Sequence, residues 1–263
     1  MLTTLQSRRT QWLWRVLPPL LPLVVWIICV EALTRAGFIK AYIVPPPFEV
    51  MTTLWDDRIE LLRALGSTLT GALIGLALSF ALGTLAAVAL SVSKVLERAF
   101  YPYAVFFQTV PVIAIAPILV IWFGFGQPTV IASAFICSVF PIIASTLLGL
   151  RSTDPALVDL FSLYGARRVD FLLRLKLPFA MPQIFSGLRI ATGLSVIGAV
   201  VGEFIGGGGL GSIVDAARAQ NRIDKVFAAV LVSSLLGVVM IGAINAVSAA
   251  VLGSWHASEK SPQ

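Results

Sequence analysis

The polar stretch 151–182 carries most of the residue types and spacings that could serve a function in this otherwise apolar chain. Asp154 followed by Pro155 predicts a helix start, because the carboxylate can accept a free backbone N–H and proline has no N–H to lose. Four apolar residues then recur at the spacing of one helix face: Leu157, Leu160, Phe161 and Tyr164. Five basic residues accompany them: Arg151, Arg167, Arg168, Arg174 and Lys176. This pattern indicates recognition of a partner rather than catalysis.

The end of this first helix and the start of a second are also marked in the sequence. Gly165 can take a positive φ and end the helix. A basic amphipathic piece follows over 166–177, and we expect Pro178 and Pro182 to end it. Two short helices joined by a turn, between apolar runs, are typical of a docking surface for a soluble partner. A basic loop that only fixes membrane topology is the alternative interpretation.

Other kinds of chemistry have little support in the sequence. Only Glu31, Arg189 and Glu203 are ionisable within apolar runs, where a charge at mid-bilayer costs about 2.5–3.5 kcal/mol. The first two lie near the ends of their runs and can snorkel, whereas Glu203 could gate, pair with a cation on another helix or cap a helix. We find no phosphate-binding motif, nucleophile elbow or metal-spaced His/Cys set. We therefore expect no catalytic residue, metal site or bound cofactor, and no ATP hydrolysis by this chain.

Composition places the chain in a lipid bilayer. The sequence has 263 residues, of which 58% are hydrophobic and only 12% charged, whereas soluble domains carry about 25% charged residues. Its apolar runs are continuous rather than alternating, which predicts helices and not a barrel. The net charge of +6 lies between the runs without a basic–aromatic cluster, so we expect no nucleic acid partner. The predicted fold class is an all-α polytopic membrane protein.

The apolar runs predict about six transmembrane helices in a single domain over 1–263. Their approximate bounds are 16–36, 64–90, 102–124, 129–150, 183–205 and 226–252. Six spans place both termini on one side, and the Lys and Arg distribution favours the cytoplasm for the termini and for 151–182.

Two segments near the second span have patterns of their own. Residues 48–63 mix apolar and acidic residues, which predicts an interfacial amphipathic helix outside the membrane; a solvated linker is the alternative. Small residues within the second span are mostly four or five apart, which lets helices approach closely in lipid: Gly66, Gly71, Gly75, Ser79 and Gly83. Packing within the chain is favoured over a dimerisation face.

The third span and the end of the fifth suggest a path for a solute. Pro111 and Pro117 should kink or break a helix, and irregular backbone at membrane depth is tolerated only against protein or a water-filled path. We therefore name as candidates for the translocation path Gln108, Pro111, Pro117 and Glu203. A purely structural kink is the alternative. The glycine cluster 206–209 is interpreted as a gate at the outer face or as a plain turn.

Several motifs resemble one family. Gly165, followed after nine residues by 175–178 (LKLP), resembles the "EAA" loop of permease subunits of ABC importers. Asp159 matches the acidic position of that loop, whereas Leu160 and Phe161 stand where the family has alanines. Residues 182–191 and 108–126 resemble the nitrate/sulfonate/taurine-type branch of these type I permeases.

This resemblance implies partners, a role for the loop, and a location in the plasma (inner) membrane of a bacterium. Its coupling residues would be Asp159, Leu160, Phe161, Tyr164, Gly165, Ala166, Arg167, Leu175, Leu177 and Pro178. The loop would insert into cytoplasmic ATP-binding subunits, which would bind ATP and Mg. A second permease copy or a paralogue would complete the path, and a periplasmic or lipid-anchored substrate-binding protein would deliver the solute. The branch implies a small anionic or organic solute, such as nitrate, taurine or an alkanesulfonate.

Two other classes of protein stay open at this point. One is an ATP-independent secondary carrier or channel, although the chain lacks the series of membrane carboxylates that a proton-coupled carrier needs. The other is a membrane scaffold or a membrane-bound enzyme subunit, for which we find no polar catalytic cluster.

Overall fold

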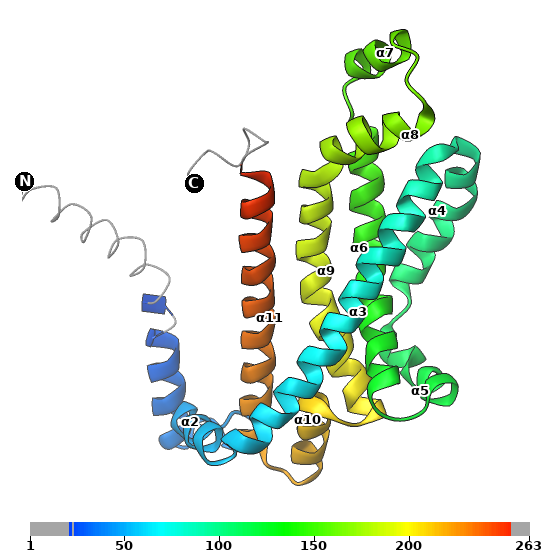
Figure 1. The fold of residues 1–263 in the computed structure, drawn as a ribbon. Helices are drawn as coiled ribbons and strands as arrows, with labels where there is room; N and C mark the ends of the chain where they lie inside the picture. Colours follow the sequence, from blue (N-terminus) through cyan, green and yellow to red (C-terminus); the bar gives the residue numbers. More distant parts are fainter. Residues whose placement is uncertain (1–20, 23, 254–263) are drawn as a thin grey trace, which may run out of the picture. The chain divides into compact units, whose positions relative to one another are not determined.

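The computed structural model describes residues 21, 22 and 24–253, and all regular secondary structure within them is helical (Figure 1). A helix over 24–35 precedes these elements: α2 (Pro47–Asp56), α3 (Arg58–Val92), α4 (Lys94–Thr109), α5 (Val112–Phe123), α6 (Gln127–Arg151), α7 (Pro155–Leu163), α8 (Arg168–Asp170), the π-helical η1 (Phe171–Lys176), α9 (Leu177–Gly206), α10 (Gly209–Ala219) and α11 (Ile223–Leu252).

The predicted all-α polytopic membrane fold is confirmed. Within the described residues, four helical stretches are long and apolar enough to cross a membrane: Arg58–Val92, Gln127–Arg151, Phe171–Gly206 and Ile223–Leu252. A shorter apolar helix, α5, joins them. Of the expected first span, 16–36, residues 16–20 and 23 lie outside the described part of the chain, and 24–35 are helical.

The predicted break within the span 102–124 is confirmed at Pro111, whereas Pro117 lies inside α5 and ends no helix. α4 ends at Thr109 and α5 begins at Val112, with Pro111 in an extended conformation between them. Proline lacks the N–H needed to continue the ladder and disfavours helical φ/ψ in the residue before it. The 12 residues of α5 span about 18 Å, less than the roughly 30 Å hydrocarbon core, so α5 alone is too short to cross it.

Two other predicted boundaries need correction. The segment 48–63 is not one helix, because α2 ends at Asp56 and residues from Arg58 onward belong to the long helix α3. Pro178 and Pro182 do not end the helix that precedes them, since α8, η1 and α9 follow without a break from 168 to 206. The π-helical turn η1 lies directly before Pro178, and its wider hydrogen-bond spacing moves the carbonyl that the proline ring would otherwise meet.

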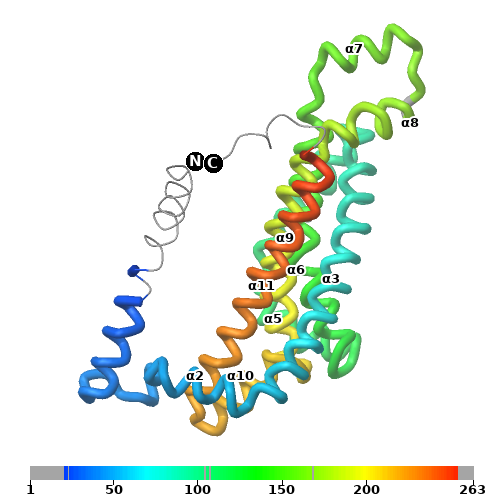
Figure 2. Tube along the Cα trace, turned by 60° about the vertical axis from the view of Figure 1, so that its left-hand side comes forward, coloured from blue at the N-terminus to red at the C-terminus, as the bar shows by residue number. Residues whose placement is uncertain are grey.

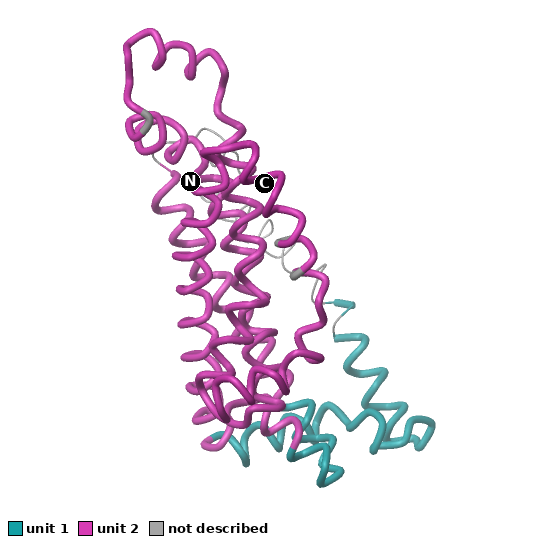
Figure 3. Tube along the Cα trace, turned by 90° about the vertical axis from the view of Figure 1, so that its right-hand side faces the viewer, with its two compact units in different colours: residues 1–58, 216–228 teal, residues 59–215, 229–263 magenta. Residues whose placement is uncertain are grey.

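The chain forms two compact units, coloured separately in Figure 3. Unit 1 comprises 1–58 and 216–228, and unit 2 comprises 59–215 and 229–263. In unit 2, α6 and α9 lie side by side along most of their length (Figures 1 and 2). One buried apolar cluster joins α3, α6, α9 and α11 there: Ala72, Leu76, Val130, Ala134, Ile142, Ala191, Val196, Ala199, Leu236 and Met240.

Small residues make this close packing possible. A Cβ placed on Gly75 of α3 would lie 2.5 Å from the Cβ of Ala134 on α6. Gly198 of α9 comes just as close, since its Cβ would lie 2.6 Å from the carbonyl oxygen of Ser133. The predicted intramolecular role of the stripe is confirmed for Gly71, Gly75, Ser79 and Gly83, which are all buried against α6. It is wrong for Gly66, which has nothing near its Cβ position.

The two ends of unit 2 carry different features. The segment with α7 and α8 projects beyond the adjoining ends of α6 and α9 (Figures 1 and 2). The opposite end holds α5 and the glycine-rich end of α9. There the Gly126 N–H donates to the Gly206 carbonyl over 2.8 Å, which ties the α5–α6 turn to α9.

Candidate functional site: the projecting loop and the buried carboxylate

The helix α7 forms for the reasons its sequence predicts. The Asp154 carboxylate accepts the Ala156 N–H over 2.9 Å and caps the helix, and Pro155 occupies its first turn. The helix ends at Leu163; Gly165, just beyond its C-cap, has a φ of +66°, and the Ala166 N–H donates to the Phe161 carbonyl over 3.1 Å. Both the predicted start and the predicted end are therefore confirmed.

No residue of α7 is buried. Leu163 and Tyr164 are 85% and 84% exposed, and Leu160 is 45% exposed. Large apolar side chains gathered on a projecting segment mark an interaction surface. The sequence pattern missed Leu163, although its spacing of three from Leu160 would have been a usable signal.

One ring contact joins α7 to the helix that follows it. The rings of Phe161 and Phe171 lie 5.7 Å apart between centroids, in a tilted arrangement. Phe161 is therefore directed toward η1, while Leu160 and Tyr164 remain exposed. The residues expected on one helix face therefore separate: Phe161 contacts Phe171, whereas Leu160 and Tyr164 are exposed.

The second half of the predicted coupling set is packed against the bundle instead. Leu175 is 7% exposed, and Leu177 packs on the buried cluster of Leu150, Ala180 and Ile184. Asp159 and Arg167, in contrast, are exposed, and Ala166 and Pro178 are half-buried. The loop thus has a presented part, 159–167, and an anchoring part, 175–178.

The four candidates for a translocation path do not form one cluster. Gln108 and Pro111 flank the break between α4 and α5, and Pro117 lies within α5; all three are exposed in the single chain. Glu203 lies elsewhere, fully buried near the end of α9.

The Glu203 carboxylate forms hydrogen bonds with Thr68 of α3 and with Gly211 near the start of α10. Its Oε2 accepts the Thr68 hydroxyl and the Gly211 N–H, each over 2.9 Å. The Leu210 N–H in turn donates to Thr68 Oγ1 over 3.0 Å. Of the roles considered from sequence, helix capping is confirmed by these contacts, and no cation contacts Glu203 within the described residues. Thr68 was missed, because only the fold brings it near Glu203.

Gly209 is required for this arrangement. Its φ is +64°, and a Cβ there would lie within 2.5 Å of all three terminal atoms of the Glu203 carboxylate. The backbone at 207 and 208 also has positive φ. The glycine cluster therefore forms a tight turn that carries the chain from α9 into α10 around a buried carboxylate.

Residues 79–253 match the family described as "Binding-protein-dependent transport system inner membrane component". The chain is a member of this family. A probable ABC transporter permease protein of Haemophilus influenzae is 37% identical over 83% of the chain and 89% of that protein. The formylaminopyrimidine transport permease protein ThiX of Halalkalibacterium halodurans is 39% identical over 78% and 83%, respectively. A putative aliphatic sulfonates transport permease protein, SsuC of Escherichia coli, is 31% identical over 86% and 87%.

The resemblance of 165–178 and 108–126 to ABC importer permeases of the nitrate/sulfonate/taurine-type branch is thus confirmed. The permease is an integral membrane protein, and its relatives are transport components. Among the residues that the structure describes, no group of three or more His, Cys, Asp or Glu could hold a metal ion.

Proposed function

We propose that this permease is the membrane-spanning translocation subunit of an ATP-driven importer, and that 151–182 couples it to separate ATP-binding subunits. The observation that carries this proposal is the projection of α7 with Leu163 and Tyr164 almost fully exposed. An apolar surface on a segment outside the apolar spans is costly unless a partner covers it. ATP and Mg²⁺ would bind to that partner.

The orientation proposed is with 151–182 and both termini in the cytoplasm of a bacterial inner membrane. At the end of unit 2 that carries α7, the chain holds Lys94, Arg151 and Arg174. At the other end, the connecting segments 110–128 and 204–215 contain no Lys or Arg, and Arg63 lies near the start of α3, so the bias is modest. This bias follows the positive-inside rule.

The path of mechanical coupling is supported by the continuity of one helix. From 168 the chain remains helical through η1 and α9 to Gly206, and Leu175 anchors it to the bundle. A displacement of α7 would reach this helix through the contact of Phe161 with Phe171, and the helix leads to Glu203, which holds α10. ATP can drive transport in this way only if its binding favours one of the two conformations of the spans over the other.

The translocation path proposed runs beside the break between α4 and α5. Gln108, Pro111 and Pro117 are exposed in the single chain and would face a second permease copy or a paralogue. Glu203 is buried, so we propose that it acts on transport by positioning α10 rather than by touching the solute. The solute class proposed is a small anionic or organic molecule, delivered by a substrate-binding protein, as the names of the sulfonate, nitrate and taurine relatives suggest.

A photo-crosslinking experiment tests the docking surface. A benzoylphenylalanine at 163, in permease expressed with its ATP-binding subunit, should yield a covalent adduct with that subunit. The matched control places the same group at Trp122 of α5, which is 71% exposed at the opposite end of unit 2. An adduct from 122 but none from 163 would contradict the assignment, and adducts from neither position would favour an ATP-independent carrier.

A further inference from the structure

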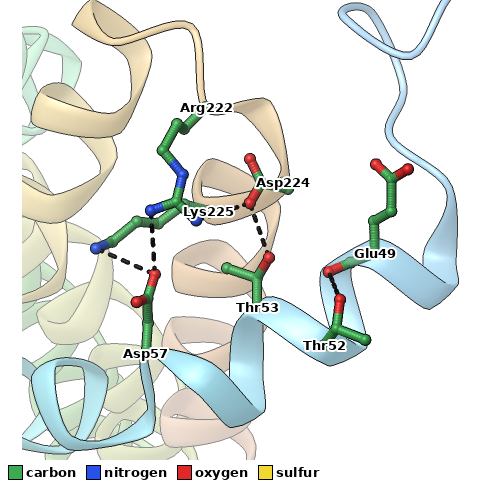
Figure 4. Close-up of polar contacts among 7 residues, drawn as sticks. All are labelled: Glu49, Thr52, Thr53, Asp57, Arg222, Asp224 and Lys225. Carbon is green, nitrogen blue, oxygen red and sulfur yellow. Dashed lines mark hydrogen bonds and ion pairs between the residues drawn. The ribbon is translucent and has the colours of Figure 1, made fainter.

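One face of α2 is fixed to the start of α11 by a polar cluster in unit 1 (Figure 4). The Thr53 hydroxyl donates to Asp224 Oδ2 over 2.7 Å. Asp57 forms ion pairs with Arg222 at 3.4 Å and Lys225 at 3.2 Å. These contacts hold α2 against the first turn of a helix that is long and apolar enough to cross the membrane.

The other face of α2 is apolar and exposed. Phe48, Met51 and Trp55 are 62%, 64% and 69% exposed, and their spacing of three and four residues places them on one side. They border a hollow of about 420 Å³, whose lining also includes Thr52, Leu54 and Asp56. Val50 and Thr53 are buried on the opposite side. The helix is thus amphipathic: its polar side contacts α11, and its apolar side is exposed.

Cations accompany the aromatic rings of unit 1. The Arg58 guanidinium lies 4.8 Å from the centroid of the Trp55 ring, and Arg35 lies 5.9 Å from that of Phe48. Lys40 lies 5.7 Å from the ring of Tyr42. Aromatic side chains with long basic side chains beside them are typical of the membrane–water interface, where rings sit at headgroup level and cations reach lipid phosphates.

The connections of α2 to two membrane-spanning candidates favour that level. Only Asp57 separates α2 from α3, which is itself a membrane-spanning candidate. The polar cluster fixes α2 to the start of α11, a second candidate. Because α2 adjoins the starts of two membrane-spanning candidates, a position at the membrane surface is favoured for it.

We propose that α2 lies in the headgroup layer of the bilayer, with Phe48, Met51 and Trp55 directed into the acyl chains. Arg35, Lys40 and Arg58 would then bind lipid phosphates. The lipid surface is favoured over a protein partner because aromatic–cation pairs recur from Arg35 to Arg58, along the chain that enters the span. Only the choice of leaflet, the outer one, rests on the proposed function.

Spin-label accessibility in nanodiscs tests this placement without any transport assay. With Cys29→Ser and Cys137→Ala as background, single labels are attached at Met51→Cys and, as matched control on the same helix, at Glu49→Cys. The label at 51 should collide several-fold more often with oxygen than with a water-soluble nickel complex, at a depth of about 5–10 Å. The label at 49 should show the reverse preference.

Two results would overturn the proposal. Nickel accessibility at both positions would show a solvated helix, and protection of both from oxygen and nickel would show a protein partner over this face. If the cysteine variants fail to fold, brominated lipids give a second measurement. The wild-type protein should lose more fluorescence to them than Trp55→Phe does, and equal losses would place Trp55 outside the acyl region.

Discussion

Replacing Thr68 by valine tests the buried hydrogen bonds that join Thr68 to Glu203 and to the start of α10. Valine has nearly the shape of threonine but can neither donate to Glu203 Oε2 nor accept the Leu210 N–H, which are contacts of 2.9 and 3.0 Å. A buried donor without a partner costs about 1–3 kcal/mol, and the lost bond to the carboxylate adds about 1 kcal/mol. We therefore expect α10 to be destabilised by at least about 2 kcal/mol.

The assay is hydrogen–deuterium exchange of the permease in nanodiscs, followed on peptides from the start of α10. A change of about 2 kcal/mol in the opening equilibrium corresponds to exchange about 30-fold faster. The control is Thr70→Val on the same helix, because Thr70 is exposed and its hydroxyl donates only to the Gly66 carbonyl. Equal exchange of α10 in both variants would refute the idea that Thr68 and Glu203 hold this helix.

Three further changes test other contacts. Gly209→Ala should destabilise α10 by about 2–5 kcal/mol, because alanine is strained at a positive φ and its Cβ would overlap Glu203. Amide exchange of α10 measures this change, and unchanged exchange would contradict the turn at 207–209. Gly75→Val should cost about 1–3 kcal/mol and lower the melting temperature in detergent, whereas Gly66→Val, with open space, should not. Phe161→Ala should speed exchange of α7 amides about two- to tenfold by removing the ring contact, and no change would show that this contact does not hold α7.

Local patterns predicted local structure well. Asp154 and Gly165 mark the ends of α7 because capping depends on a few neighbouring residues. The stripe of small residues in α3 also predicted close packing correctly, because helices in a membrane approach closely where their side chains are small.

Prolines show where sequence reasoning reaches its limit. Pro111 separates two helices, whereas Pro178 and Pro182 lie within a continuous helical stretch. A π-helical turn precedes Pro178, and no local residue pattern predicted it.

The partners of Glu203 could not be predicted either. Thr68 is 135 positions away in the chain, and only the packing of α3 against α9 and α10 brings the two side chains together. The sequence left gating, ion pairing and capping open for this carboxylate, and its contact with the Gly211 N–H shows capping. The exposure of Leu163 likewise depends on how α7 projects from the bundle.

The most direct test of the central claim is the amount of ATP-binding subunit that co-purifies with a Gly165→Trp permease. Gly165 has a φ of +66° and nothing near its Cβ position, so the substitution places a large ring in the turn proposed to dock. The control, Gly124→Trp, has a similar φ of +80° and similar open space at the other end of unit 2. We predict that Gly165→Trp inserts normally but loses the ATP-binding subunit, while Gly124→Trp retains it; equal co-purification of both with the subunit would contradict the account.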